Sequence, residues 1–190
     1  MLNIGVLISG GGTNLQAIID ETKSGGINGT VKLVISNKEN AYGLERARLS
    51  KIKAVYETDE DKIIELLKEN NIDLIVLAGY LKIITPKFVD EFRNKIINIH
   101  PSLIPSFCGK GYYGEKVHQG VIDYGAKVTG ATVHFVDEGA DTGAIIMQET
   151  VNVEQDDDAK SLAKRVLEVE HRILKESIRL FCENKIKYSG

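Results

Sequence analysis

Short apolar runs alternate with segments of helical periodicity along the first half of the chain. The run Leu2–Ile8 is nearly continuous, as expected of a strand buried on both faces of a sheet, and Asp73–Ala78 is the strongest run of this kind. Such alternation with short connections favours an α/β fold, a mostly parallel, twisted sheet with helices on both faces. We expect strands at Leu2–Ile8, Val31–Ile35, Lys53–Tyr56, Asp73–Ala78 and Lys95–Ile99, and helices at Asn14–Lys23, Ala41–Lys51, Asp61–Asn70 and around Phe88–Phe92.

The pattern changes in the second half of the chain. Val128–Val136 and Ala144–Val153 are strand-like and flank a turn-rich connection, so we expect antiparallel strands that extend the parallel sheet. Ala159–Asn184 has apolar residues at helical spacing and predicts a long C-terminal helix. The stretch His100–Gly114 is irregular and rich in glycine, which predicts a loop. Ligands bind at such loops in α/β sheets.

Composition narrows the class of protein. The 190 residues suit one domain, and we expect residues 1–190 to form it. Lys and Arg number 24 against 27 Asp and Glu, a net charge of −3, which excludes bulk electrostatic binding to nucleic acid or to an anionic membrane. Two cysteines are too few for a disulfide scaffold. No apolar run is long enough to span a bilayer, and the first residues predict a strand rather than a signal peptide. We therefore expect a cytoplasmic protein.

A glycine-rich turn, Ser-Gly-Gly-Gly-Thr-Asn at residues 9–14, joins the first predicted strand to the first predicted helix. It is not the dinucleotide fingerprint, because Leu15 stands where the third glycine would be, and it lacks the Lys-Ser/Thr of a Walker loop. Backbone N–H groups that open a helix favour an anion such as phosphate. A turn needed only for tight packing is the alternative interpretation.

Asn98 and His100 form a second candidate site. Strand alternation places both side chains on one side, at the carboxyl end of a predicted parallel strand. An amide and an imidazole can both donate hydrogen bonds to a developing oxyanion, and histidine can move protons, so the pair suits acyl transfer. A histidine that is merely capped by backbone at a strand end is the alternative.

Two acidic residues extend this candidate site. Asp141 lies inside the turn Asp137–Gly143 with two other acids, and near His100 it would orient the imidazole and favour its protonated form. Spacing alone leaves open whether the two residues meet. Glu170 lies beside the apolar stripe of the last predicted helix, where a charged residue needs a partner, either a ligand amine or an internal Arg or Lys. His118, His134 and Cys108 lack metal-ligand spacing, so we expect no metal.

Nearly the whole chain resembles the folate-dependent formyltransferase family. The run Asn-Ile-His-Pro-Ser at residues 98–102 is typical of the group, and the opening Ser-Gly-Gly-Gly-Thr-Asn-Leu at residues 9–15 narrows the resemblance to its purine-synthesis members. Matching segments also occur at residues 36–37, 43–47, 77–83 and 133–136. The resemblance implies a Rossmann-like fold that holds no dinucleotide. It also implies transfer of a formyl group from 10-formyltetrahydrofolate to the amine of glycinamide ribonucleotide.

The resemblance also implies a role for each matched position. Asn98 and His100 would stabilise the oxyanion and handle its proton, and Asp141 would keep His100 charged. Glu170 would meet the glycinamide side of the substrate. The phosphoribosyl end would bind at Gly12, Thr13 and Asn14, and the pterin pocket would be lined by Leu81, Lys82, Ile83, Ile84 and Val136, with Asn98 also in contact with the folate. The partners implied are these two small molecules, with neither nucleic acid nor membrane, for a monomer or homodimer.

Two segments depart from the family pattern. The acidic segment Tyr56–Asp61 is shorter than its counterparts and offers no match for a folate-contacting Arg. Lys116 replaces the first histidine of a G-x-H-x-H pattern, and we expect this change to affect the loop more than catalysis. Two alternatives stay open: another 10-formyltetrahydrofolate-dependent transferase or hydrolase, and a non-catalytic nucleotide-binding module. Transferases that act on methionyl-tRNA normally carry an extra domain, so the length of this chain favours the purine reaction.

Overall fold

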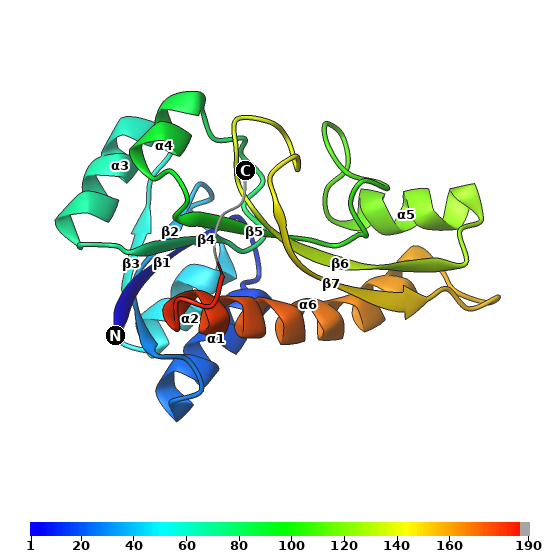
Figure 1. Ribbon diagram of the computed structural model, residues 1–190, viewed down its shortest axis with the longest axis horizontal. Helices are drawn as coiled ribbons and strands as arrows, with labels where there is room; N and C mark the ends of the chain where they lie inside the picture. Colours follow the sequence, from blue (N-terminus) through cyan, green and yellow to red (C-terminus); the bar gives the residue numbers. More distant parts are fainter. Residues whose placement is uncertain (187–190) are drawn as a thin grey trace.

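A seven-stranded sheet forms the centre of the molecule, in the order β3-β2-β1-β4-β5-β6-β7 (Figure 1). The computed structural model describes residues 1–186; the last four residues of the expected domain lie outside the described part. The first five strands pair in parallel, and β6 and β7 add to them in antiparallel fashion, which confirms the predicted extension. The strands are β1 (Leu2–Ile8), β2 (Gly29–Ser36), β3 (Lys53–Tyr56), β4 (Leu74–Leu77), β5 (Ile96–His100), β6 (Val128–Phe135) and β7 (Ile145–Asn152).

Helices cover both faces of the sheet, as the alternating pattern predicts. One core cluster joins the sheet to α1 (Thr13–Ser24), α2 (Tyr42–Leu49) and the long α6 (Ala159–Cys182). A second cluster on the opposite face joins it to α3 (Glu60–Glu69) and α4 (Pro86–Glu91) (Figure 1). The strands β1 and β4 lie between these layers, so their side chains are apolar on both faces.

Local sequence signals fix where several helices begin. Asp59 caps α3 by accepting hydrogen bonds from two backbone N–H groups, and Thr85 caps α4 ahead of Pro86 at the first helical position. Asp158 forms a capping box with Ser161 at the start of α6. No helix in residues 1–186 is both long enough and apolar enough to cross a membrane.

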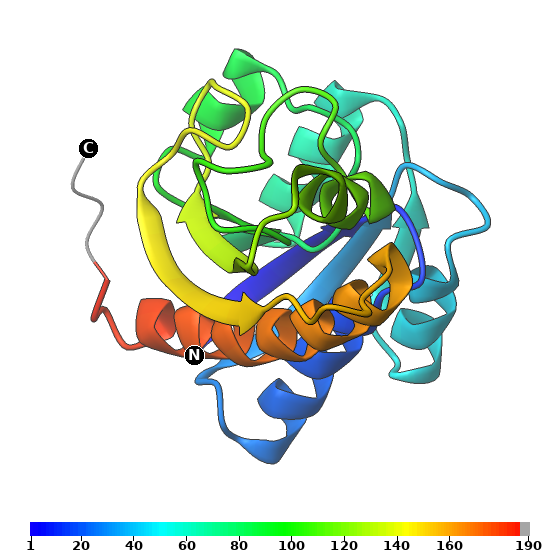
Figure 2. The same cartoon turned by 90° about the vertical axis from the view of Figure 1, so that its right-hand side faces the viewer.

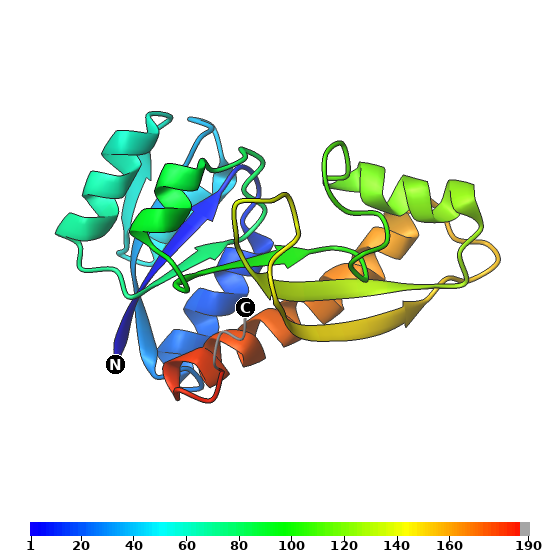
Figure 3. The same ribbon diagram turned by 45° about the horizontal axis from the view of Figure 1, so that its top comes forward.

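The helix α5 (Glu115–Tyr124) was not among the predicted elements. It follows the loop after β5, stands apart from α3 and α4, and packs against α6 (Figures 2 and 3). Its apolar signal is weak, because Val117 and Val121 are its only buried hydrophobic residues and Gly120 lies in its interior.

The strand order creates a crevice at one edge of the sheet. The chain runs outward from β1 to β2 and β3 on one side, and from β4 onward on the other. At such a switch point the loops after neighbouring strands diverge, and open α/β sheets bind ligands there. The carboxyl ends of β1, β4 and β5 all face this crevice.

Candidate active site

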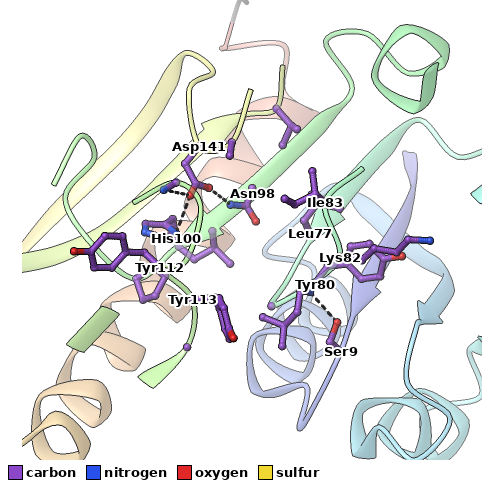
Figure 4. A pocket seen from close by; sticks show the side chains of 18 of the residues that line it. Ser9, Leu77, Tyr80, Lys82, Ile83, Asn98, His100, Tyr112, Tyr113 and Asp141 are labelled. Carbon is purple, nitrogen blue, oxygen red and sulfur yellow. Dashed lines mark hydrogen bonds and ion pairs between the residues drawn. The ribbon is translucent and has the colours of Figure 1, made fainter. Parts of the chain in front are cut away.

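A cavity of about 610 Å³ opens at this edge of the sheet, within the usual range of about 300–1,000 Å³ for small-molecule sites. Figure 4 shows Asn98, His100 and Asp141 turned toward one another at one end, with Leu77 and Ile83 at the other. Nine of the predicted site residues line it: Leu81, Lys82, Ile83, Ile84, Asn98, His100, Val136, Asp141 and Glu170. The predicted phosphate-binding residues Gly12, Thr13 and Asn14 do not line the cavity, although Ser9 and Gly10 of the same turn do.

The two β5 residues reach the cavity from the same face of the strand, as alternation predicts. The side chain of His100 is nearly buried, and its Nε2 lies 2.9 Å from the carbonyl oxygen of Phe107 in the following loop. A carbonyl only accepts, so Nε2 carries a hydrogen and donates it. The ring is therefore anchored through Nε2, and Nδ1 is directed toward Asp141.

Asp141 links the two β5 side chains. Its Oδ2 lies 3.6 Å from His100 Nδ1 and accepts from the Gly109 N–H at 2.9 Å, while its Oδ1 lies 3.5 Å from Asn98 Nδ2. Burial opposes ionisation, but hydrogen bonding with His134, the charge of His100 and the Gly109 N–H together keep the pKa of Asp141 below its ordinary value. The carboxylate is thus ionised where it faces the ring of His100.

His134 is a member of this cluster that the sequence did not reveal. It pairs with Asn98 across β5 and β6, and its Nε2 lies 3.1 Å from Asn98 Nδ2 and 3.6 Å from Asp141 Oδ1. Its Nδ1 donates to the carbonyl of Phe135 at 2.7 Å, which fixes the ring. His134 therefore positions the amide of Asn98. We call Asn98, His100, His134 and Asp141 the polar cluster.

The glycine turn is held against α2 by its carbonyl groups. Gly10 O accepts from the Gly43 N–H at 3.0 Å, and Gly11 O accepts from Arg46 Nε at 2.8 Å. Gly12 has a φ of 71°, and a Cβ there would lie 2.7 Å from the Cα of Gly43, so only glycine fits. No side chain caps the start of α1, which leaves the N–H groups of its first turn free of side-chain acceptors.

Glu170 enters the cavity from α6 and meets the first turn of α1. Asn14 Nδ2 donates to its Oε2 at 2.8 Å, so the structure joins two predicted binding residues that are far apart in the sequence. Burial raises the pKa of Glu170 to about 7, and the bond from Asn14 offsets this only in part. Asn14 Oδ1 is itself buried with no partner among the described residues. Glu170 is thus a buried carboxyl group with one hydrogen-bond donor in this part of the chain to stabilise its ionised form.

The other end of the cavity is an apolar wall formed by Leu81, Ile83, Ile84 and Val136. Two of these side chains are notably exposed, Leu81 by 54% and Ile83 by 69%. The backbone here is fixed by Ser9, whose hydroxyl accepts from the Leu81 N–H at 2.8 Å. Exposed apolar side chains gathered at a cavity mouth are typical of a binding surface.

The acidic segment Tyr56–Asp61 contains no Lys or Arg and so contributes no positive charge to the site. Glu57 accepts hydrogen bonds from the backbone N–H groups of Thr58 and Asp59, and Asp59 caps α3. Lys82 Nζ donates to the carbonyl of Thr58 at 2.8 Å, which places a positive charge between this segment and the cavity.

The loop between β5 and α5 brings two tyrosines to the cavity. Tyr112 and Tyr113 line it, and the ring of Tyr112 packs edge-on against Phe107, whose carbonyl anchors His100. Lys116 lies over the ring of Tyr113 at 4.6 Å and bonds its hydroxyl at 2.9 Å. Lys116 therefore contacts the loop and not the polar cluster. Its expected effect on loop behaviour stays a prediction.

Within the described part of the chain, no group of three or more His, Cys, Asp or Glu side chains is arranged to hold a metal ion.

Comparisons with known proteins show which proteins this chain is similar to. A family model described as formyl transferase matches residues 2–178. A phosphoribosylglycinamide formyltransferase of Haemophilus influenzae is 44% identical, over 98% of this chain and 90% of that protein. A chloroplastic protein of the same name from Arabidopsis thaliana is 40% identical, and this chain spans 67% of its length. The crystal structure of glycinamide ribonucleotide transformylase 1 from Symbiobacterium toebii superposes with a TM-score of 0.94 at 43% identity, over 100% of this chain and 92% of that one.

Proposed function

The chain belongs to the formyl transferase family, and from this premise we propose that it transfers the formyl group of 10-formyltetrahydrofolate to the amine of glycinamide ribonucleotide. The products are formylglycinamide ribonucleotide and tetrahydrofolate. The observation that carries the proposal is the convergence of Asn98, His100 and Asp141 at one end of a cavity whose other end is apolar. Related proteins named as trifunctional purine biosynthetic proteins support a place for this reaction in purine biosynthesis.

Formyl transfer requires attack on a carbonyl and the movement of one proton. The amine nitrogen attacks the formyl carbon, and a carbon–nitrogen bond forms as the carbonyl oxygen takes up negative charge. The tetrahedral intermediate then collapses by breaking the bond to N10 of the folate, which accepts the proton that the amine loses. Donors aimed at the oxyanion and a group that moves the proton are the two requirements of the site.

Asn98 and His100 supply the donors in this proposal. His100 is anchored through Nε2, so its Nδ1–H is the donor that faces the reacting groups. The 3.6 Å separation between Nδ1 and Asp141 is too long for a strong hydrogen bond, so Nδ1–H stays available to the substrate oxygen. The amide of Asn98, held by His134, supplies a second donor.

Asp141 supplies a negative charge beside Nδ1 of His100. Its lowered pKa keeps the carboxylate ionised at neutral pH. An ionised carboxylate beside the tetrahedral centre is also placed to help the proton pass from the amine nitrogen to N10 of the folate. The polar cluster thus meets both requirements of the reaction with residues from three separate segments.

The two substrates would bind at opposite ends of the cavity. The phosphate of glycinamide ribonucleotide is assigned to the N–H groups at Gly12, Thr13 and Asn14, which open α1 without a side-chain cap and follow the cavity-lining Ser9 and Gly10 of the same turn. Glu170 faces the glycinamide side of the substrate. There a substrate amine or hydroxyl would add a second hydrogen-bond donor to the one that Asn14 supplies. The pterin is assigned to the apolar wall, with Lys82 and the backbone of residues 81–84 at its edge.

The proposal is tested by supplying the purified protein with 10-formyltetrahydrofolate, with and without glycinamide ribonucleotide. We expect tetrahydrofolate to form only when the ribonucleotide is present, together with an equal amount of formylglycinamide ribonucleotide. Release of formate at the same rate without the ribonucleotide would identify a hydrolase instead. Binding of the ribonucleotide with no turnover would identify a non-catalytic module.

A further inference from the structure

His118 is a buried titratable residue that the proposed mechanism does not use. It lies on α5, is only 4% exposed, and lines the same cavity as His100 and Glu170. Val117 and Val121 of the same helix are buried in the core, so packing holds this wall of the cavity in place. The imidazole is therefore presented to the cavity by a fixed element and not by the mobile end of a long side chain.

The ring of His118 differs from the other two imidazoles of the cavity in its hydrogen bonding. Both nitrogens of His100 and of His134 face polar partners within the protein. The Nδ1 of His118 is buried and has no partner in residues 1–186, and no residue there bonds its Nε2. Because the buried Nδ1 has no acceptor for a hydrogen among these residues, Nε2 is the nitrogen through which this ring can donate to a molecule bound in the cavity.

The surroundings of His118 favour its neutral form and determine which ring nitrogen carries the hydrogen. Burial lowers the pKa of His118, the positive charge of His100 lowers it further, and Glu115 acts weakly in the opposite direction. A neutral imidazole carries one N–H, and a buried N–H without an acceptor is less favourable than a bare nitrogen. The hydrogen therefore resides on Nε2, so that His118 presents one donor to the cavity.

We propose that His118 contacts the amine substrate, its Nε2–H donating a hydrogen bond to an oxygen of glycinamide ribonucleotide. The assignment to this substrate rests on the proposed function and on the position of α5. This helix packs against α6, which carries Glu170, and stands away from the α3 and α4 side of the molecule (Figure 3). Ile83 of the apolar wall assigned to the pterin lies in the loop after β4, across the cavity from Tyr112 and Tyr113, which precede α5 (Figure 4).

The test compares His118→Leu with His118→Gln by calorimetric titration with glycinamide ribonucleotide and by steady-state kinetics. Leucine fills similar space without a donor, whereas the glutamine amide places an N–H close to the position of Nε2. We expect His118→Leu to raise the Kd and KM for the ribonucleotide roughly tenfold, with kcat and the KM for the folate within about twofold. His118→Gln should stay within about threefold of wild type in every parameter.

His171 offers a matched control. It is also a partly buried histidine with an unpartnered nitrogen and a lowered pKa, but it lies outside the cavity, so His171→Leu should leave the Kd unchanged. An unchanged Kd in His118→Leu, or an equal loss in His118→Leu and His118→Gln, would overturn the proposal. So would a wild-type protein that does not bind the ribonucleotide. A wild-type protein that binds it without turnover contradicts the proposed function alone, because the Kd values still test His118.

Discussion

Two carboxylates face the same cavity, and their surroundings shift their pKa values in opposite directions. The side chain of Asp141 is 17% exposed and is surrounded by His100, His134 and the Gly109 N–H, which keep its pKa low. Glu170 is 8% exposed and has Asn14 as its one hydrogen-bond donor in residues 1–186, so burial raises its pKa to about 7. The difference lies in the number of donors around each group, since burial acts the same way on both.

The contrast in pKa indicates different roles for Asp141 and Glu170. Asp141 is ionised by the protein itself, which suits a residue that must orient the imidazole of His100 throughout the reaction. Glu170 has a single donor among the described residues, Asn14, until a bound molecule supplies more, which suits a residue that binds a substrate. Carboxylates whose environments separate their pKa values in this way often divide the roles in an active site.

The largest expected effect follows from removing the charge partner of Asp141. His100→Ala should lower kcat for formyl transfer on the order of a hundredfold or more, because a donor aimed at the oxyanion is lost. The measurement is the steady-state rate at saturating concentrations of both substrates. His171→Ala, outside the cavity, serves as the control. A wild-type kcat in His100→Ala would show that the polar cluster does not act in the chemical step.

A smaller effect on stability should appear at Glu170. An acid whose pKa is raised from 4.5 to about 7 in the folded protein loses its stabilising contribution as pH rises through that range. Between pH 5 and pH 8, the free energy of unfolding of the wild type should therefore fall by about 2 kcal/mol relative to that of Glu170→Gln. Urea denaturation at a series of pH values measures this difference.

The exposed Glu168 on the same helix gives the matched control for this experiment. Glu168→Gln should follow the wild-type pH dependence. If Glu170→Gln follows it as well, Glu170 is ionised without difficulty and the contrast with Asp141 disappears.

The smallest effect is expected on the apolar wall, away from both carboxylates. Ile83→Ala removes exposed apolar surface that the pterin would cover, so the KM for 10-formyltetrahydrofolate should rise about threefold to fivefold with kcat unchanged. Leu49 is similarly exposed on α2 outside the cavity, and Leu49→Ala should change neither value. A fall in kcat for Ile83→Ala would show that the wall and the polar cluster are not separate.

Most of the fold was predictable because its signals are local. The buried strands β1 and β4 are apolar on both faces, and Thr85-Pro86 and Asp158 mark the starts of helices by well-understood capping. The helix α5 was missed because its burial depends on contact with α6, and Gly120 weakens the local helical signal. The helix α5 therefore depends on tertiary contact with α6, which local helix propensity does not indicate.

The site was predictable only in part for a similar reason. Alternation along β5 places Asn98 and His100 on one face whatever the rest of the chain does. Asp141 reaches them because its turn adopts a φ of 59° and brings its carboxylate back to Gly109. The place of His134 depends on the register between β5 and β6, which a long loop and a helix separate in the chain. Sequence periodicity carries no information on that register.

The division of work between the two carboxylates is tested most directly by their isosteric amide variants. We predict that Asp141→Asn lowers kcat about a hundredfold at saturating substrates and leaves the KM for glycinamide ribonucleotide nearly unchanged. Glu170→Gln should raise that KM and leave kcat within a few-fold of wild type. The reverse pattern, or equal losses of kcat in both variants, would contradict this account.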